Sequence, residues 1–383
     1  MSEIDAMPEL VRIAAQPSGA DSCNGSLDDV LLFDFLMQRG ESQSPIHAEC
    51  LNTHLSRALV PEAVPAITFV FSGEGMQYFA VGRELFRTCL PFRESIMELD
   101  QVYASVVGTS LVQSSGLFEC PTDDLTDAVG DLRSIAVTLP ALTMVQLALV
   151  DAMAASGIHP DVVVGYSAGE AAVLSASGAA SNVVALKLAI AQGRALSHLE
   201  EARGAMAEVS CTPDQARAII SEVRGELGVG VLEVACYNTP GALSLSGYED
   251  HVELAVAKAY EAGIFARRLD TRVPLHSPMV EWCRAELRHL LSDIFSEHEE
   301  CIPKVPVYSS VTGALFRDPF DTDYYWDGAV QPVLFQDAIE EMILRYQGVI
   351  FIEIGPRSVL TSYLRSMTAD IENFSVISPL DHI

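Results

Sequence analysis

The chain has few cationic side chains. Its 23 lysines and arginines stand against 52 aspartates and glutamates, which gives a formal net charge of −29 over 383 residues. Proteins that bind the nucleic-acid backbone without regard to sequence do so through an excess of positive charge. The composition therefore argues against a nucleic-acid partner.

The chain also lacks the cysteine patterns of disulfide-rich and metal-binding proteins. Its eight cysteines are scattered, with no CxxC pair and no metal-ligand spacing. We expect buried thiols in a reducing compartment, a cytoplasmic location and no metal site.

We also expect neither a secretion signal nor a membrane-spanning segment. The first residues, Met1 to Asp5, are acidic and lack the hydrophobic segment of a signal peptide. The longest apolar helical candidate, 137–154, contains Pro140 and is expected in the core. We expect no apolar run of membrane-spanning length and no membrane partner.

Hydrophobic residues make up 49% of the chain, enough for a substantial core. The pattern predicts an α/β fold, with a large α/β-hydrolase-like domain around a central parallel sheet, formed by 63–202 and 273–383. Residues 1–62 are polar and are expected to form a flexible extension or a docking segment, with a possible helix at 27–38.

Residues 203–272 are expected to form a smaller, inserted subdomain. Strands and helices alternate there as βαββαβ, which is the ferredoxin-like pattern. The expected strands are 205–209, 231–236, 242–246 and 265–269, and the helices are 213–227 and 250–262. A further strand, at 348–354, belongs to the large domain.

The most informative motif is Gly165-Tyr166-Ser167-Ala168-Gly169, which reads Gly-x-Ser-x-Gly. Aliphatic residues precede it and a helical pattern follows it, which is the context of a nucleophile elbow. Ser167 would stand at a helix N-terminus, where partial positive charge favours a developing oxyanion. A chance match in a chain rich in Gly, Ala and Ser is the alternative.

Among nine histidines, His276 is the best candidate for a base. It lies in a proline-bracketed loop, Val273-Pro274-Leu275-His276-Ser277-Pro278-Met279, between an expected strand and a helix. Loops held by rigid elements are where catalytic groups concentrate. The alternative is a histidine that only caps the following helix.

Several ordered segments together resemble the malonyl-CoA:acyl-carrier-protein transacylase family, which includes the acyltransferase domains of fatty-acid and polyketide synthases. The resemblance covers roughly residues 65 to 375. The matching segments are Phe69-Val70-Phe71-Ser72-Gly73-Glu74-Gly75-Met76-Gln77, Gly165 to Glu170, Asn238-Thr239-Pro240-Gly241, His276-Ser277-Pro278-Met279, Val311-Thr312-Gly313, Tyr325-Trp326 with Gln331-Pro332-Val333, and Phe351-Ile352-Glu353-Ile354-Gly355-Pro356.

The resemblance implies a serine-dependent transacylase of polyketide or fatty-acid biosynthesis. Ser167 would attack an acyl thioester while His276 takes its proton, and a carrier-protein phosphopantetheine thiol would then accept the acyl group. The oxyanion hole would be the backbone N–H groups of Glu74 and Ala168, and Asn238 would shape the pocket floor. Acyl-CoA or acyl-phosphopantetheine would be a substrate, with no bound cofactor, and an acyl carrier protein would be the partner.

One departure from the family bears on the acyl group. Gln192 stands where malonyl-type members have an arginine that grips the free carboxylate of the acyl group. Arg194 lies about 200° around the helix and should not replace it. Because glutamine has no charge to pair with a buried carboxylate, the sequence favours a neutral acyl group over malonyl or methylmalonyl.

Three further departures lie near the expected site. Val273-Pro274-Leu275 replaces the family's usual residues before the histidine, so Leu275 is expected to contact the substrate. Tyr166 replaces the histidine of the serine motif, and Glu74 replaces a glutamine. A Glu74 carboxylate would oppose a forming oxyanion, unless the side chain points away or is protonated. Drift in a degenerating enzyme is the alternative.

Docking of a carrier protein, which is usually acidic, would require a local basic patch. The best candidate is Arg267, Arg268 and Arg272 on the strand leading to His276. The alternative is surface charge paired with Asp270 and nearby acids.

Two other functions fit the same residues. A hydrolase would use Ser167 and His276 to release stalled acyl groups from a carrier protein to water. A non-catalytic carrier-binding scaffold is favoured by the changes at Glu74 and Tyr166, and opposed by the intact Ser167, His276 and Asn238.

Overall fold

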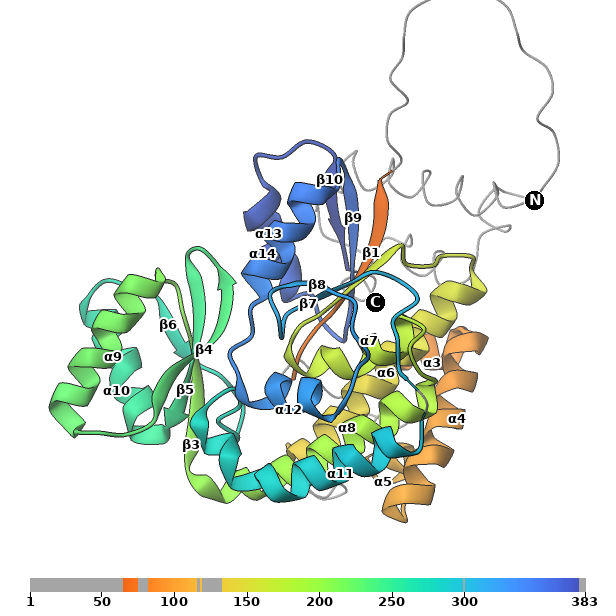
Figure 1. The fold of residues 1–383 in the computed structure, drawn as a ribbon, viewed down its shortest axis with the longest axis horizontal. Helices are drawn as coiled ribbons and strands as arrows, with labels where there is room; N and C mark the ends of the chain where they lie inside the picture. The colour runs from red at the N-terminus through yellow and green to blue at the C-terminus, as the bar shows by residue number, and fades with distance from the viewer. Residues whose placement is uncertain (1–64, 75–81, 116–117, 119–132, 299, 379–383) are drawn as a thin grey trace, which may run out of the picture.

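The structure is a computed structural model that describes residues 65–74, 82–115, 118, 133–298 and 300–378. It contains a six-stranded and a four-stranded sheet, and the smaller sheet projects with two helices to one side of the larger part (Figure 1). The predicted segment 1–62 and its helix at 27–38 lie outside the described residues.

The larger sheet has the strand order β10-β9-β1-β2-β7-β8. Its neighbours pair in parallel except for β7 and β8, which pair antiparallel, so the central sheet is mixed at one edge and the expectation of a parallel sheet holds for the other five strands. The strands are β1 Ala66–Phe71, β2 Val162–Gly165, β7 Val307–Ser309, β8 Ala314–Phe316, β9 Val349–Ile354 and β10 Phe374–Ile377.

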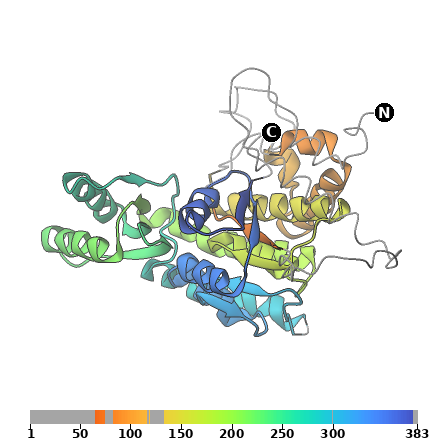
Figure 2. The same cartoon turned by 90° about the horizontal axis from the view of Figure 1, so that it is seen from above.

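The central strands of this sheet are buried along their whole length. Every residue of β1, β2 and β9 is buried, as apolar runs are when helices cover both faces of a parallel sheet. Figure 2 shows helices on both sides of these strands. The helices of this part are α3 Arg83–Thr88, α4 Leu90–Val107, α5 Leu111–Ser115, α6 Ile135–Ala155, α7 Glu170–Ala176, α8 Asn182–Leu196, α11 Arg284–Ser296, α12 Thr322–Val330, α13 Phe335–Arg345 and α14 Leu360–Thr368.

Helix α6 corrects one expectation. It has 21 residues and is apolar enough to cross a membrane by length and composition, although no such run was expected. However, 78% of its apolar window is buried inside the fold, and the helix packs against α4 and α8. It is therefore apolar on all sides because it is a core helix, with Pro140 inside it as predicted.

The smaller sheet lies within residues 204–268 and has its own hydrophobic core. Its strand order, β4-β5-β3-β6, is that of a ferredoxin-like βαββαβ unit and confirms the predicted fold class. The elements are β3 Gly204–Val209, α9 Pro213–Leu227, β4 Leu232–Thr239, β5 Ala242–Tyr248, α10 Glu249–Glu261 and β6 Ala266–Arg268. The expected domain boundaries at 203 and 272 stay a prediction.

A short backbone connection joins the two parts. Tyr237 N–H donates to the carbonyl of Val333 at 2.8 Å, and Val333 N–H donates to the carbonyl of Ala235 at 2.8 Å. Cys236 and Val333 thus form an isolated parallel bridge. Strand β4 of the small sheet is therefore tied to the loop between α12 and α13.

Candidate active site

Ser167 lies at a sharp turn between a buried strand and a helix. β2 ends at Gly165, a 3-10 turn η2 spans Ser167–Gly169, and α7 follows. Ser167 has a φ of 52°, in the left-handed region that a residue with a side chain rarely adopts. A side chain at Gly165 would collide with the Glu170 carboxyl, and one at Gly169 with the backbone of Phe71. Both glycines of the motif are therefore required by close packing.

His276 faces Ser167 from the loop before another 3-10 turn, η4 Pro278–Cys283. Its Nε2 lies 2.6 Å from Ser167 Oγ, and its Nδ1 lies 3.1 Å from the carbonyl oxygen of Gln331. Because a carbonyl can only accept, Nδ1 carries the proton and Nε2 is free to accept from the serine. His276 also has a positive φ, 54°. The backbone at both residues is thus held in a strained conformation, as is common at functional sites.

His276 is 4% exposed. Burial lowers its pKa to about 4, although the backbone carbonyls near it, chiefly that of Gln331, act in the opposite direction. The imidazole is therefore neutral at pH 7, which is the form that can take a proton from Ser167.

Buried side chains hold the turn in place. Glu170 accepts hydrogen bonds from the backbone N–H and hydroxyl of Ser310, both at 3.1 Å, and from the Tyr324 hydroxyl at 2.9 Å. Burial nevertheless raises the pKa of Glu170 to about 7. On the neighbouring strand end, Gln146 donates to the carbonyl of Ser72 at 2.8 Å and so fixes the start of the loop that carries Glu74.

The Glu74 side chain points towards α6. Thr138 Oγ1 donates to Glu74 Oε1 at 3.3 Å, and a hydrogen bond with Thr271 also acts on this carboxyl. Burial is the largest influence and raises the Glu74 pKa to about 7, with smaller contributions from Asp270 and Glu200. A large fraction of Glu74 is therefore protonated at neutral pH, which reduces the repulsion that an anion there would exert on an oxyanion.

Tyr166 and Asn238 meet beside the nucleophile. The Tyr166 hydroxyl donates to Asn238 Oδ1 at 2.8 Å, and the ring packs edge-on against Phe335. Asn238 is fully buried and its Nδ2 lies 3.3 Å from both Ser244 Oγ and the Tyr363 hydroxyl. The structure thus brings together Tyr166 and Asn238, both of which the sequence analysis assigned to substrate binding.

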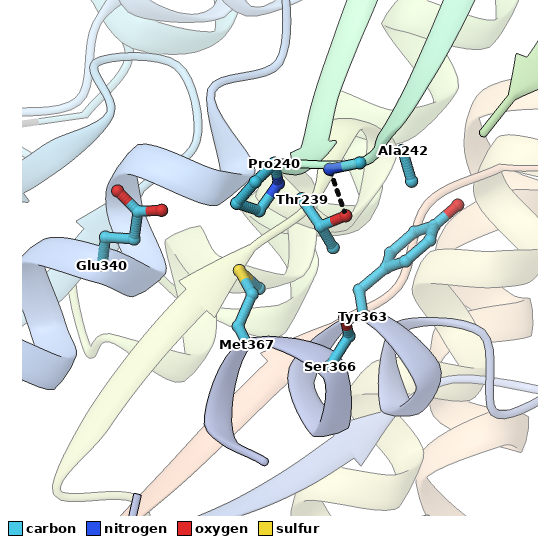
Figure 3. A pocket seen from close by; sticks show the side chains of 8 residues that line it. Thr239, Pro240, Ala242, Glu340, Tyr363, Ser366 and Met367 are labelled. Carbon is cyan, nitrogen blue, oxygen red and sulfur yellow. Dashed lines mark hydrogen bonds between the residues drawn. The ribbon is translucent and has the colours of Figure 1, made fainter. Parts of the chain in front are cut away.

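Sequence reasoning missed the residues behind Asn238. The Tyr363 hydroxyl donates to Glu208 Oε1 at 2.8 Å, across 155 positions of chain. Figure 3 shows Tyr363 rising from α14 towards the β4–β5 hairpin, where it lines a pocket of about 540 Å³ with Met367 and the hairpin residues 239–242. No local pattern marks either residue, because their pairing depends on the fold.

Gln192 lies on α8 and is half-buried. Arg194, on the same helix, is exposed and pairs with Glu286 of α11 at 3.3 Å. The arginine therefore points to a surface partner, in keeping with the angular argument from the sequence. Leu275 is buried in the main core next to His276.

The three candidate docking arginines lie on or after β6. Arg267 donates to Glu208 Oε2 from both Nε and Nη2 at 2.9 Å, and Arg268 contacts Glu249 and Glu253 at 2.7 Å. Arg272 is exposed in the following loop. These pairs favour the alternative to a docking patch, in which Arg267 and Arg268 are surface charges neutralised by acidic residues. The acidic partners are Glu208, Glu249 and Glu253, and not Asp270.

The chain is similar to known acyl transferase domains. A family model described as the acyl transferase domain matches residues 68–380. A highly reducing polyketide synthase of Strobilurus tenacellus is 38% identical over 327 residues, which is 85% of this chain and only 11% of that synthase.

Solved structures show the same fold. The acyltransferase domain from the second module of the salinomycin polyketide synthase has a TM-score of 0.70 at 30% identity, covering 82% of this chain and 69% of that one. A malonyl CoA-acyl carrier protein transacylase from Clostridium perfringens has a TM-score of 0.67 at 27% identity, covering 82% and 92%.

Proposed function

This chain belongs to the acyl transferase domain family, and we propose that it moves an acyl group from a thioester donor to an acyl carrier protein through an ester on Ser167. The observation that carries the proposal is the 2.6 Å contact between Ser167 Oγ and His276 Nε2. The reaction would need no bound metal or cofactor, and acyl-CoA or acyl-phosphopantetheine would enter as a substrate.

In the first half-reaction, Ser167 Oγ attacks the thioester carbonyl carbon while His276 Nε2 takes the hydroxyl proton. The carbon–sulfur bond then breaks, and the leaving thiolate receives that proton from the imidazolium. In the second half, the carrier's phosphopantetheine thiol gives its proton to His276 and attacks the ester. The serine oxygen leaves and recovers the proton, so that the enzyme is unchanged.

The oxyanion of each tetrahedral intermediate would be bound by two backbone N–H groups, those of Ala168 and Glu74. Ala168 follows the nucleophile inside the η2 turn, and Glu74 follows the end of β1, next to β2 in the sheet. Each such donor typically stabilises the transition state by about 3 kcal/mol.

We further propose that the acyl group is neutral. Gln192 offers no charge, and Arg194 is occupied by Glu286 at the surface. A malonyl carboxylate would therefore enter a partly buried region without a bidentate cation. Asn238 and Tyr166, which are joined by a 2.8 Å hydrogen bond, would form one wall of the acyl pocket.

The test is intact mass spectrometry after incubation with acetyl-CoA, butyryl-CoA and malonyl-CoA. We expect an acyl adduct that Ser167→Ala abolishes and that the control Ser105→Ala, at an exposed position of α4, leaves intact. An adduct that survives Ser167→Ala would place the nucleophile elsewhere. An adduct that forms and is lost to water, without transfer to any carrier, would favour the hydrolase.

A further inference from the structure

A chain of hydrogen bonds runs from the residue next to the nucleophile to the edge of the small sheet. Tyr166 O–H donates to Asn238 Oδ1, Asn238 Nδ2 donates to the Tyr363 oxygen, and Tyr363 O–H donates to Glu208 Oε1. Arg267 closes the chain by donating twice to Glu208 Oε2. The five residues come from β2's turn, from β4, β3 and β6 of the small sheet, and from α14.

The direction of every bond in this chain follows from Glu208. A carboxylate paired with an arginine can only accept hydrogen bonds, so the Tyr363 hydroxyl must donate to Glu208. The Tyr363 oxygen can then only accept, and this turns the Asn238 amide so that its nitrogen faces Tyr363. The amide oxygen is left facing Tyr166, whose hydroxyl must donate to it.

The burial of the two tyrosines keeps them neutral donors. Burial raises the pKa of Tyr363 above its usual value, with the Glu208 carboxylate adding to it, and burial does the same to Tyr166. Ser244 Oγ, the other neighbour of Asn238 Nδ2, can donate or accept and therefore imposes no direction. Glu208 is thus the group that sets the orientation.

We propose that Glu208 and Tyr363 are positioning residues for acyl selection. By orienting the Asn238 amide they commit the Tyr166 hydroxyl proton to Asn238, so the wall beside Ser167 offers no free donor to the acyl group. The site therefore prefers plain hydrocarbon acyl chains over chains with a hydrogen-bond acceptor near the thioester. This inference rests on the proposed function and extends it from neutral to hydrocarbon acyl groups.

Glu208→Gln should reverse the donor–acceptor direction of these hydrogen bonds, because glutamine has the same shape as glutamate but carries an amide. Arg267 requires an oxygen, so the glutamine amide nitrogen must face Tyr363 and donate to it. Tyr363 O–H then donates to Asn238, whose amide turns over, and its nitrogen donates to Tyr166. The Tyr166 proton is then no longer committed to Asn238. Cys236, whose sulfur is a weak acceptor, and Ser244 also bond with the Tyr166 hydroxyl, and an acceptor on the acyl chain would compete with them for the proton.

The experiment compares Ser167 acylation by butyryl-CoA and by acetoacetyl-CoA, which differ by one keto acceptor at the third carbon. We expect wild type to favour butyryl, and Glu208→Gln to raise the acetoacetyl-to-butyryl rate ratio about two- to tenfold, the worth of one neutral hydrogen bond. Tyr166→Phe added to Glu208→Gln should cancel the rise, because no hydroxyl is left to release.

The matched control is Glu233→Gln, which removes the charge of another small-sheet carboxylate, paired with Arg224 at 2.6 Å. It should leave the ratio unchanged. Should Glu208→Gln not fold, Glu208→Ala removes the acceptor of the Tyr363 hydroxyl, which can then donate to Asn238, and this variant should shift the ratio in the same direction. An unchanged ratio in whichever variant folds would overturn the inference.

A second measurement does not depend on activity. The Tyr166 and Glu208 side chains are linked through Asn238 and Tyr363, so a double-mutant cycle of Tm for Tyr166→Phe and Glu208→Gln should be non-additive if the two ends are coupled. Additive Tm changes would contradict it. A wild type that no thioester acylates, with a non-additive cycle, would refute the proposed function and leave the hydrogen-bond chain standing.

Discussion

The two sides of the candidate site are held by different means. On the large-sheet side, Ser167 and His276 are placed mainly by backbone: positive φ values, tightly packed glycines and the carbonyl of Gln331. Where the turn after β2 meets the small sheet, the side chains of Tyr166 and Asn238 are held by hydrogen bonds to each other and to other side chains. Backbone support tolerates many sequences, whereas a side-chain network changes with single substitutions. The first arrangement suits chemistry common to a family, and the second suits selection among acyl groups.

The largest effect should come from removing the base on the backbone-held side. His276→Ala should slow acylation of Ser167 by about 10²–10⁴-fold, the usual contribution of a general base. Stopped-flow release of CoA measures this step, and His159→Ala, at an exposed position, is the control. Near-normal turnover by His276→Ala would remove this residue from the mechanism.

The acyl pocket can be changed without touching the chemistry. Gln192→Arg should raise malonyl loading relative to butyryl by about ten- to hundredfold, because a charge-assisted hydrogen bond to a carboxylate contributes about 1.5–3 kcal/mol. Gln192→Met, which is uncharged and of similar length, should not show this change. If wild type loads malonyl as readily as butyryl, the argument from Gln192 is wrong.

Glu74 allows a smaller test through pH. Its raised pKa, about 7, means that the carboxyl is neutral below this pH and becomes an anion as pH rises through it. The anion opposes the oxyanion, so acylation should slow by about fivefold above pH 7, equivalent to about 1 kcal/mol of Coulomb repulsion.

Glu74→Gln keeps the backbone N–H and should abolish that decline. The acidic limb, set by the lowered His276 pKa of about 4, should be the same in both proteins. A wild-type profile that stays flat from pH 6 to 9 would show that the Glu74 carboxyl does not act on the oxyanion.

The smallest effect is expected at the surface. Reversing Arg268 and Arg272 to Glu, with Arg267 kept because it holds Glu208, should raise the KM for an acidic carrier protein by about two- to fivefold, since exposed, compensated charges contribute little. The KM for acyl-CoA should not change. Equal losses with both substrates would indicate a structural role for these arginines.

The sequence predicted the elements whose signals are local. The helix expected at 213–227 is found as Pro213–Leu227, because Pro213 begins it and a capping box joins Thr212 to Gln215. The nucleophile turn was predicted in the same way, from glycines flanking a serine after an apolar strand.

What the sequence could not predict depends on long-range contacts. Tyr363 and Glu208 pair across 155 positions, and the acceptor for His276 is a backbone carbonyl, which any residue at 331 provides. Similarly, the apolarity of α6 reflects neighbours on all sides rather than a lipid phase. The Gln331-Pro332-Val333 segment entered the sequence analysis as part of the family resemblance, without a role in supporting the histidine.

The bridge between Cys236 and Val333 connects the small sheet to the loop that orients His276. Gln331, which orients the His276 imidazole, is two residues from Val333, and Val333 is bonded to β4 on both of its backbone groups. A tilt of β4, the strand that also carries Asn238, would therefore reach the imidazole through two residues of chain. The position of the acyl-pocket wall at Asn238 and the orientation of the His276 imidazole are thereby coupled through the backbone.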